Sequence, residues 1–300
     1  MDLSEIAIAF NDCNAETSGH SFKDYVDAKK QNGLVFSRGV IVDDANNFIL
    51  YDCEKLLTKA ILNSISADLL SCNGLFNWSF VSSYYSSFFA VQALNRLQLN
   101  FTGYHSKCEL INFHRKEINL FENPKSTGSH VEQFELFKTN AKEFKKNKGD
   151  RFWNIGLGNF EEIEGYNSEP NLRNEINYSI SILHKFYYEL SISKNDYNKI
   201  VRDNLRSPFI ERETISLPPN FARRASKIAI ARIRVLSSVM NYIANYNSEY
   251  KSYFERNMRN RIIPIKGRYP FISNWLLNQL EDWLKFHELP IEEVKVKTIL

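Results

Sequence analysis

The feature that most constrains the fold is an aromatic-rich segment that is apolar around most of a helix. Between Ser79 and Leu97 the chain reads SFVSSYYSSFFAVQALNRL. Phe80, Tyr84, Phe88 and Val91 recur at helical spacing, and Tyr85, Phe89 and Ala93 lie beside them. A helix that is apolar on most sides has to be covered on most sides. We therefore predict that this segment is a central helix.

Periodic apolar residues and helix-start signals predict several more helices. The apolar period predicts helices over residues 45–70, from 221 onward and over 272–286. A Ser followed three residues later by a Glu forms a capping box, which predicts helix starts at Ser106 and Ser129. Ser168, followed by Glu169 and Pro170, marks another start, because proline is tolerated in the first turn. The expected fold class is all-α, an antiparallel helical bundle followed by a second, basic helical region.

Prolines mark the expected domain boundary. Ser207-Pro208 and Leu217-Pro218-Pro219 interrupt the helical pattern, because proline disfavours helical geometry in the residue before it. We predict an N-terminal extension over 1–44, a helical bundle over 45–206, a linker over 207–220 and a basic helical region over 221–300. The stretch 33–50 is the only one that suggests strands.

The positive charge is concentrated in the C-terminal region. Residues 220–300 hold 14 Lys and Arg against 7 Asp and Glu, whereas residues 1–219 hold 24 against 28. On the helix expected from residue 221, Arg223, Lys227 and Arg234 fall within about 40° of one another, with Arg224 beside them. Further basic residues alternate with Tyr250, Tyr253, Phe254 and Tyr269, and these are Arg256, Arg259, Arg261 and Arg268.

Arginines interleaved with aromatic rings suit phosphate contacts combined with base stacking. The region is therefore a candidate RNA or DNA interface. Two other interpretations remain open: the basic face pairs with the acidic first part of the same chain, or it docks an acidic protein.

Three segments occur in an order that resembles the HEPN family of prokaryotic helical bundles: Ser83–Leu97, Phe101–Phe113 and Leu172–Ser179. The resemblance covers about residues 45–191. It implies a dimerising bundle that acts in toxin–antitoxin or antiphage defence, often as a metal-independent ribonuclease. In active members an arginine and a histidine four to six residues later promote attack of a ribose 2′-hydroxyl on the adjacent phosphate. A fainter resemblance links the C-terminal part to YaaC-like bacterial proteins.

The family motif is incomplete in this chain. Arg173 and Asn174 match its arginine and the polar residue that often follows, but Tyr178 occupies a position where histidine is expected. Tyrosine is a poor base near neutral pH. Three interpretations remain: a catalytically silent bundle, a diverged ribonuclease using Arg173, Asn174 and Tyr178, or an ordinary helix in which Arg173 pairs with Glu169. His105, which follows Gly103, matches the family turn, and His105 and Lys107 are candidate phosphate contacts.

Several other classes are disfavoured by the sequence. The four cysteines are widely spaced, with no zinc-ligand spacing, so no metal site is expected. No Gly-rich phosphate loop is present, and Gly156-Leu157-Gly158 lacks the third glycine of a dinucleotide fingerprint, so no cofactor is expected. No membrane span or export signal is predicted, which favours a cytoplasmic protein. The leading hypothesis is a nucleic-acid-associated defence or toxin–antitoxin component with a silent bundle, forming a homodimer or binding a partner protein; a protein-interaction adaptor is the alternative.

Overall fold

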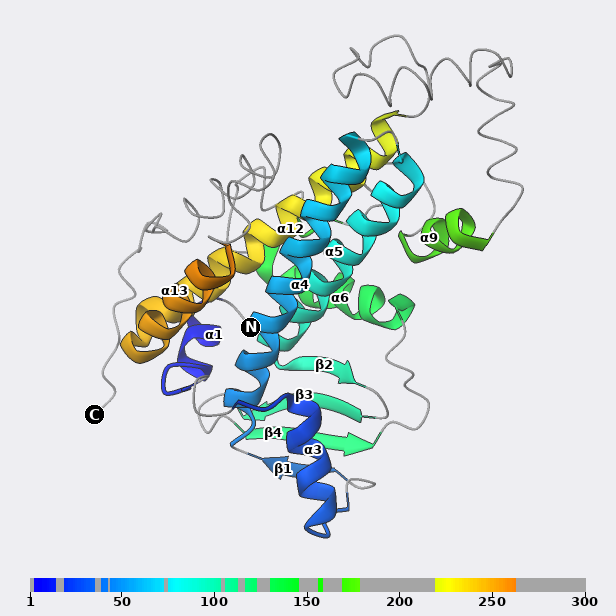
Figure 1. Cartoon of the computed structure of the whole chain (residues 1–300). Coiled ribbons are helices and arrows are strands. Elements are labelled where there is room, and N and C mark those ends of the chain that lie inside the picture. Colours follow the sequence, from blue (N-terminus) through cyan, green and yellow to red (C-terminus); the bar gives the residue numbers. More distant parts are fainter. Residues whose placement is uncertain are drawn as a thin grey trace, which may run out of the picture.

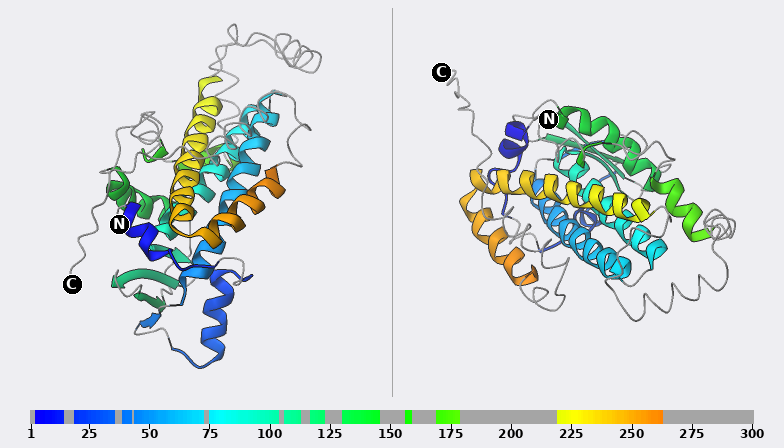
Figure 2. Two further views of the ribbon diagram at one scale, coloured as in Figure 1. Left: turned by 90° about the vertical axis from the view of Figure 1, so that its left-hand side faces the viewer. Right: turned by 90° about the horizontal axis from the view of Figure 1, so that it is seen from above.

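The computed structural model describes residues 3–14, 19–35, 39–42, 44–72, 75–103, 106–112, 117–122, 130–145, 156–158, 169–178 and 219–262. Three long helices form the centre of the molecule: α4 (Asn46–Cys72), α5 (Phe76–Leu97) and α12 (Pro219–Tyr246). They run side by side (Figures 1 and 2), and among the described elements α4 and α5 share the most extensive contact.

The predicted central helix is confirmed. Helix α5 packs against α4, α12, α6 (His130–Lys145), α9 (Glu169–Tyr178) and the sheet. Phe80, Tyr84, Phe88 and Val91 are all buried, as their spacing predicted. Because so many elements cover α5, the residues on its different faces are brought close to segments distant in sequence.

Shorter helices surround this layer. Helix α1 (Leu3–Ala9) packs on α12, and α13 (Ser248–Ile262) follows α12 after a short break. Helix α3 (Phe22–Gln31) lies over the end of α4 and one side of the sheet (Figure 1). Its Phe22 ring lies 5.0 Å from the Phe101 ring, edge to face. The expected N-terminal extension therefore contributes to the common core.

The described part of the chain is mostly helical, as predicted, and a small antiparallel sheet is added to the helices. The sheet consists of β1 (Val40–Val42), β2 (Asn100–Gly103), β3 (Ser106–Asn112) and β4 (Glu117–Glu122), in the order β1-β4-β3-β2. The suggestion of strands within 33–50 is confirmed by β1. The helix expected from Ser106 is wrong, because that residue begins β3.

The reason for this error is visible in the pattern of β3. Cys108 is buried between Lys107, which is partly exposed, and Glu109, which is exposed. Such alternation suits a strand with one buried face. Pairing of Cys108 with Phe101 and Leu120 fixes the register, so the capping-box pattern is overridden by long-range contacts.

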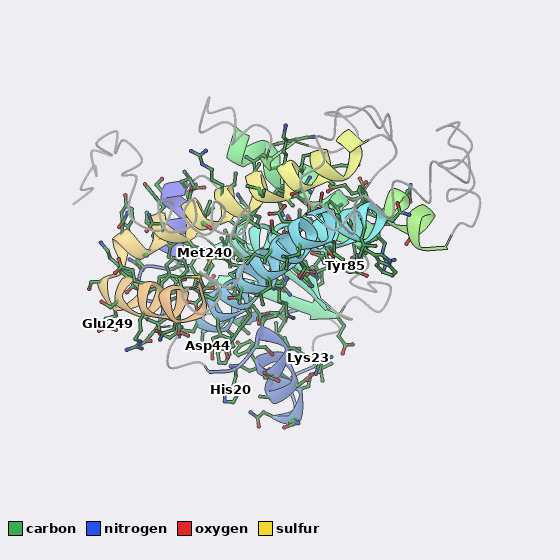
Figure 3. The ribbon with its side chains drawn as sticks, turned by 45° about the horizontal axis from the view of Figure 1, so that its top comes forward. His20, Lys23, Asp44, Tyr85, Met240 and Glu249 are labelled. Atoms are coloured by element: carbon green, nitrogen blue, oxygen red, sulfur yellow. The ribbon has the colours of Figure 1, made fainter. Side chains whose placement is uncertain are left out.

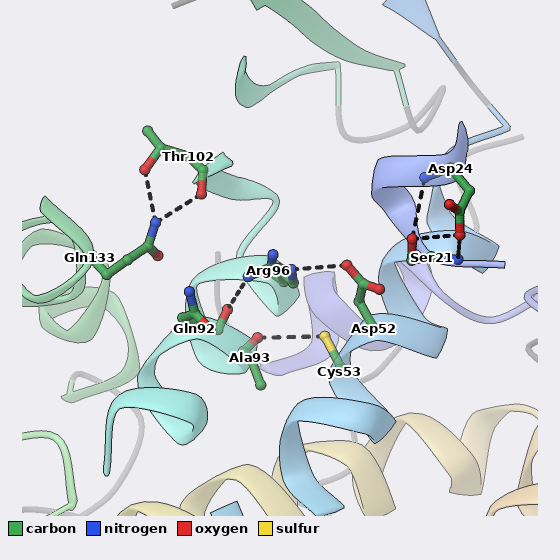
Figure 4. A network of polar contacts seen from close by, with 9 residues as sticks. All are labelled: Ser21, Asp24, Asp52, Cys53, Gln92, Ala93, Arg96, Thr102 and Gln133. Carbon is green, nitrogen blue, oxygen red and sulfur yellow. Dashed lines mark hydrogen bonds and ion pairs between the residues drawn. The ribbon is translucent and has the colours of Figure 1, made fainter. Parts of the chain in front are cut away.

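A buried polar network fixes α6 against α5 and the sheet, and Figure 4 shows the part of it that joins Gln133 to Thr102. The side chain of Gln133 donates from Nε2 to the Thr102 carbonyl at 2.8 Å and to Thr102 Oγ1 at 2.9 Å. Asn95 donates from Nδ2 to the Gln133 carbonyl, and Asn140 donates to Asn95 Oδ1, each at 3.0 Å. These contacts set the position of the α6 N-terminus, where His130 is the first residue.

Helix α12 shares one hydrophobic core with α4 and α5. Its predicted apolar stripe is buried: Ala225, Ala229, Leu236, Met240 and Ile243. The domain boundary at 207–220 stays a prediction, because residues 207–218 lie outside the described residues, as does the helix expected over 272–286.

Candidate functional site at the junction of α5, α6 and α9

Arg173 lies on α9 against the aromatic face of α5. Its Nη2 donates a hydrogen bond to the Tyr85 hydroxyl, and its guanidinium carbon lies 5.4 Å from the centre of the Tyr85 ring. Its Nη1 donates to Asn174 Oδ1 at 2.8 Å. In Figure 3, Tyr85 lies close to α9 and far from His20 and Asp44, which lie near α3. A partly exposed guanidinium is thus held at the junction of α5 and α9.

His130 reaches the same part of α5 from α6. Its ring stacks on Phe88 with centroids 3.9 Å apart, and it meets the Tyr85 ring edge to face at 5.7 Å. Nδ1 of His130 and the Tyr84 hydroxyl share a hydrogen bond, in which either group can donate. The Tyr85 ring is therefore in contact with an arginine from α9 and with a histidine from α6.

The surroundings favour the neutral form of His130. Burial lowers the pKa of the imidazole, and the positive charge of Arg173 lowers it further. The position at the start of a helix acts in the same direction, because the helix dipole disfavours a cation there. Burial and the Glu169 charge raise the pKa of Tyr84, so its hydroxyl stays protonated. Near neutral pH the cluster therefore combines a fixed cation with an uncharged imidazole.

A buried ion pair anchors α9 next to this cluster. Arg232 of α12 donates from Nη1 to both carboxylate oxygens of Glu169, at 3.0 and 2.7 Å, and to Ser87 Oγ on α5. Its Nε donates to the Gly156 carbonyl at 3.2 Å and its Nη2 to the Gly158 carbonyl at 3.0 Å. All three nitrogens of this guanidinium are bonded, which offsets much of the cost of removing the charge from water.

Close packing against α12 requires a glycine at position 156. A Cβ on Gly156 would lie 2.7 Å from Val235 Cγ2 and 2.8 Å from the Ala231 carbonyl oxygen, so only glycine fits against α12. Leu157 is buried in the core. The Gly156-Leu157-Gly158 sequence thus serves packing and the bonding of Arg232.

The other residues predicted for catalysis or phosphate binding are placed as follows. Asn174 is exposed and accepts from Arg173. Tyr178 is the last residue of α9, but its side chain lies outside the described residues, as does all of His105. Lys107 lies on β3, where its Nζ is 3.3 Å from Glu109 Oε2 and 5.4 Å from the centre of the Phe121 ring.

The predicted basic interface is only partly described. Lys227 on α12 and Arg256 on α13 are exposed, and Arg234 is partly buried. Arg223 and Arg224 lie on α12 and Arg259 and Arg261 on α13, with side chains outside the described residues; Arg268 lies outside them altogether.

The aromatic residues expected to stack on bases are partly buried in the protein core. Tyr250 and Phe254 are 1% and 2% exposed, so these two rings are not available for stacking. Tyr253 is partly exposed, and the centre of its ring lies 6.0 Å from the guanidinium carbon of Arg256. Tyr269 lies outside the described residues.

Comparison of the chain with protein-family models, curated proteins and solved structures found no match. Within the described part of the chain, no group of three or more His, Cys, Asp or Glu side chains is arranged to hold a metal ion. None of the described helices is long and apolar enough to cross a bilayer.

Two residues of the junction were not predicted from the sequence. His130 gives no sequence signal of a functional role, because no local pattern places residue 130 beside residue 88. Arg232 did carry a signal: it stands seven residues after Ala225 and four before Leu236, in the middle of the apolar stripe. A charged residue at such a position is expected to have a buried partner.

Proposed function

We propose that this protein is a nucleic-acid-associated component of a bacterial defence or toxin–antitoxin system that cleaves RNA without a metal ion at the junction of α5, α6 and α9. One observation carries the proposal: Arg173 and a neutral His130, from two different helices, contact the same Tyr85 ring. In this proposal, His130 of α6 takes the role of the histidine that the local sequence lacks after Arg173. This arrangement favours the diverged ribonuclease over the silent bundle.

The proposed reaction divides the work between the two side chains. Arg173 binds the phosphate and stabilises the negative charge that develops on its oxygens. When Nδ1–H of His130 donates to the Tyr84 oxygen, the lone pair of Nε2 can take the proton of a ribose 2′-hydroxyl. The 2′-oxygen then bonds to phosphorus while the bond from phosphorus to the 5′-oxygen breaks, and the 5′-oxygen takes a proton from water. The products are a 2′,3′-cyclic phosphate and a 5′-hydroxyl end.

The basic residues of α12 and α13 have a supporting role in this proposal. Lys227 and Arg256 are exposed, and contacts of such side chains with phosphates supply affinity without sequence preference. We expect RNA binding to weaken steeply with added salt, because binding releases counterions from the strand. The assignment to defence or toxin–antitoxin systems rests on the resemblance to the HEPN family.

The test is incubation of the full chain with labelled single-stranded RNA in EDTA. Wild type is compared with Arg173→Ala, Arg173→Lys and His130→Gln, and products are resolved on a gel. His20→Gln is the matched control, because His20 is exposed and lies near α3, far from Tyr85 (Figure 3). We expect cleavage by wild type and His20→Gln, a loss on the order of 100-fold or more for His130→Gln, and a similar loss for Arg173→Ala.

Two results would contradict the proposal in different ways. RNA that is bound with salt-dependent affinity but never cleaved would mean a silent bundle that binds nucleic acid. Absence of both binding and cleavage would favour the protein-interaction adaptor.

A further inference from the structure

We propose that Arg232 is a positioning residue of the junction: its ion pair with Glu169 holds α9 in the place where Arg173 lies against Tyr85 and close to His130. The inference deepens the proposed function, on which its catalytic consequence rests. The placement of α9 can be tested without RNA.

Helix α9 needs such an anchor. Its described part has 10 residues, and a helical segment of that length is marginally stable in water without tertiary contacts. Its main packing contact is with α5. Its first residue, Glu169, is buried, and the carboxylate is bonded by Arg232 and by Ser87 Oγ.

The geometry connects this anchor directly to the cluster. Glu169 and Arg173 are four residues apart on α9, about 6 Å along the helix axis, so fixing one places the other. On α5, Ser87 is two residues from Tyr85, the partner of Arg173. Arg232 bonds to Glu169 and to Ser87 at once, and it thereby sets α9 relative to the part of α5 that carries Tyr85.

Packing alone does not require a charged side chain at position 232. An apolar side chain would fill the same place in the α12 stripe, which is otherwise formed by residues such as Ala225, Ala229 and Leu236. Buried ion pairs are often replaceable by apolar residues without loss of stability. A guanidinium that joins α5, α9 and the segment 156–158 specifies where a short helix sits. Helix α12 thereby also links the basic C-terminal region to the junction.

The test is the pKa of His130, measured by NMR titration of the full-length protein labelled at histidine, with the signal assigned through His130→Gln. His130 is faced by Tyr84, Tyr85 and Phe88 of α5 and by the charge of Arg173 from α9. Removing that charge in Arg173→Ala is expected to raise the pKa of His130. Glu169→Gln is also expected to raise it, by less than Arg173→Ala, because α9 leaves its position and takes Arg173 with it while the negative charge of Glu169 is lost as well.

The direction of the shift separates displacement from direct electrostatics. Loss of the negative charge of Glu169, by itself, would lower the pKa of His130, so a rise in Glu169→Gln reports movement of α9. The double variant Glu169→Gln/Arg173→Ala should show no larger rise than Arg173→Ala, because the two changes act through one contact. Asp52→Asn is the control: it breaks the ion pair of Asp52 with Arg96 between α4 and α5, outside the junction, and should leave the pKa unchanged (Figure 4).

An unchanged or lowered pKa of His130 in Glu169→Gln, with a raised pKa in Arg173→Ala, would overturn the inference. If Glu169→Gln does not fold, Ser87→Ala removes one contact of Arg232 and should give a smaller rise; no rise there would likewise overturn it. Failure of the ribonuclease proposal is recognised separately, by the absence of RNA cleavage in a protein whose His130 titrates as expected.

Discussion

The hydrogen bond between Tyr84 and His130 defines the state of the imidazole at the residue scale. Tyr84 is buried, and its ring stacks on Phe88 as well as on His130. These rings restrict the imidazole to one plane, and the hydroxyl fixes which nitrogen faces the protein. Whether Nε2 of His130 carries a lone pair or a proton therefore depends on the hydrogen bond between Nδ1 and the Tyr84 hydroxyl.

Replacement of Tyr84 by Phe tests this contact. The ring stacking is kept, but Nδ1 of His130 loses its partner, so we expect a loss of about 1 kcal/mol in the free energy of unfolding, measured in urea. Tyr246→Phe is the matched control, because the Tyr246 side chain is exposed and its hydroxyl bonds to the Tyr242 hydroxyl at 3.1 Å. Equal losses in both variants would contradict the expected role of Tyr84.

The lowered pKa of His130 predicts a pH dependence of stability. Below 6.5, its ordinary value, the unfolded chain takes up the proton more readily than the folded one. The stability due to the neutral imidazole is thus present above 6.5 and is lost as the pH falls toward the lowered pKa. We expect the melting temperature to fall less between about pH 7 and about pH 5 in His130→Gln than in wild type. The same dependence of the melting temperature on pH in both proteins would show that folding does not lower the pKa of His130.

At the scale of elements, the close contact between residue 156 and α12 fixes the position of the segment 156–158. In Gly156→Ala the new Cβ meets a backbone oxygen at 2.8 Å, and a backbone atom cannot rotate away. We expect a loss of about 1–3 kcal/mol in the free energy of unfolding. A neutral effect in thermal or urea unfolding would mean that the segment 156–158 does not pack on α12 as described.

The placement of α6 depends on Gln133. Replacing it with Ala leaves the buried Thr102 carbonyl and hydroxyl without their donor, so we expect a loss of about 2 kcal/mol in the free energy of unfolding. Glu135→Ala is the control on the same helix: Glu135 is exposed and pairs with Lys138, and such a surface ion pair is worth about 0–1 kcal/mol. The two variants, compared in urea, should therefore differ clearly.

At the scale of the whole molecule, α12 depends on the bundle for its stability. It buries a continuous apolar stripe against α4 and α5, and helices in proteins owe most of their stability to such packing. We expect an isolated fragment of residues 219–262 to show low helicity by circular dichroism, or to aggregate. A stably helical, monomeric fragment would support an independent C-terminal domain instead.

Much of the fold follows from periodicity in the sequence. The helical spacing of Phe80, Tyr84 and Phe88 determined that α5 is a buried helix, and the stripe from Ala225 to Ile243 determined α12. The strand β3 was missed because a start signal at Ser106 is read from four residues, whereas strand pairing depends on residues far away in the chain. Local patterns predict elements, and pairing is a long-range property.

The candidate site was determined by sequence only at Arg173. Its position relative to Tyr85, His130 and Arg232 was decided by the tertiary structure alone, because these residues come from α5, α6 and α12 and meet only when the helices pack. Charge in the sequence was also not enough: Arg232 was counted among the basic residues of the C-terminal region, yet in the fold it is buried and neutralised by Glu169. Burial, which sequence position does not fix, decides whether an arginine serves a ligand or the protein itself.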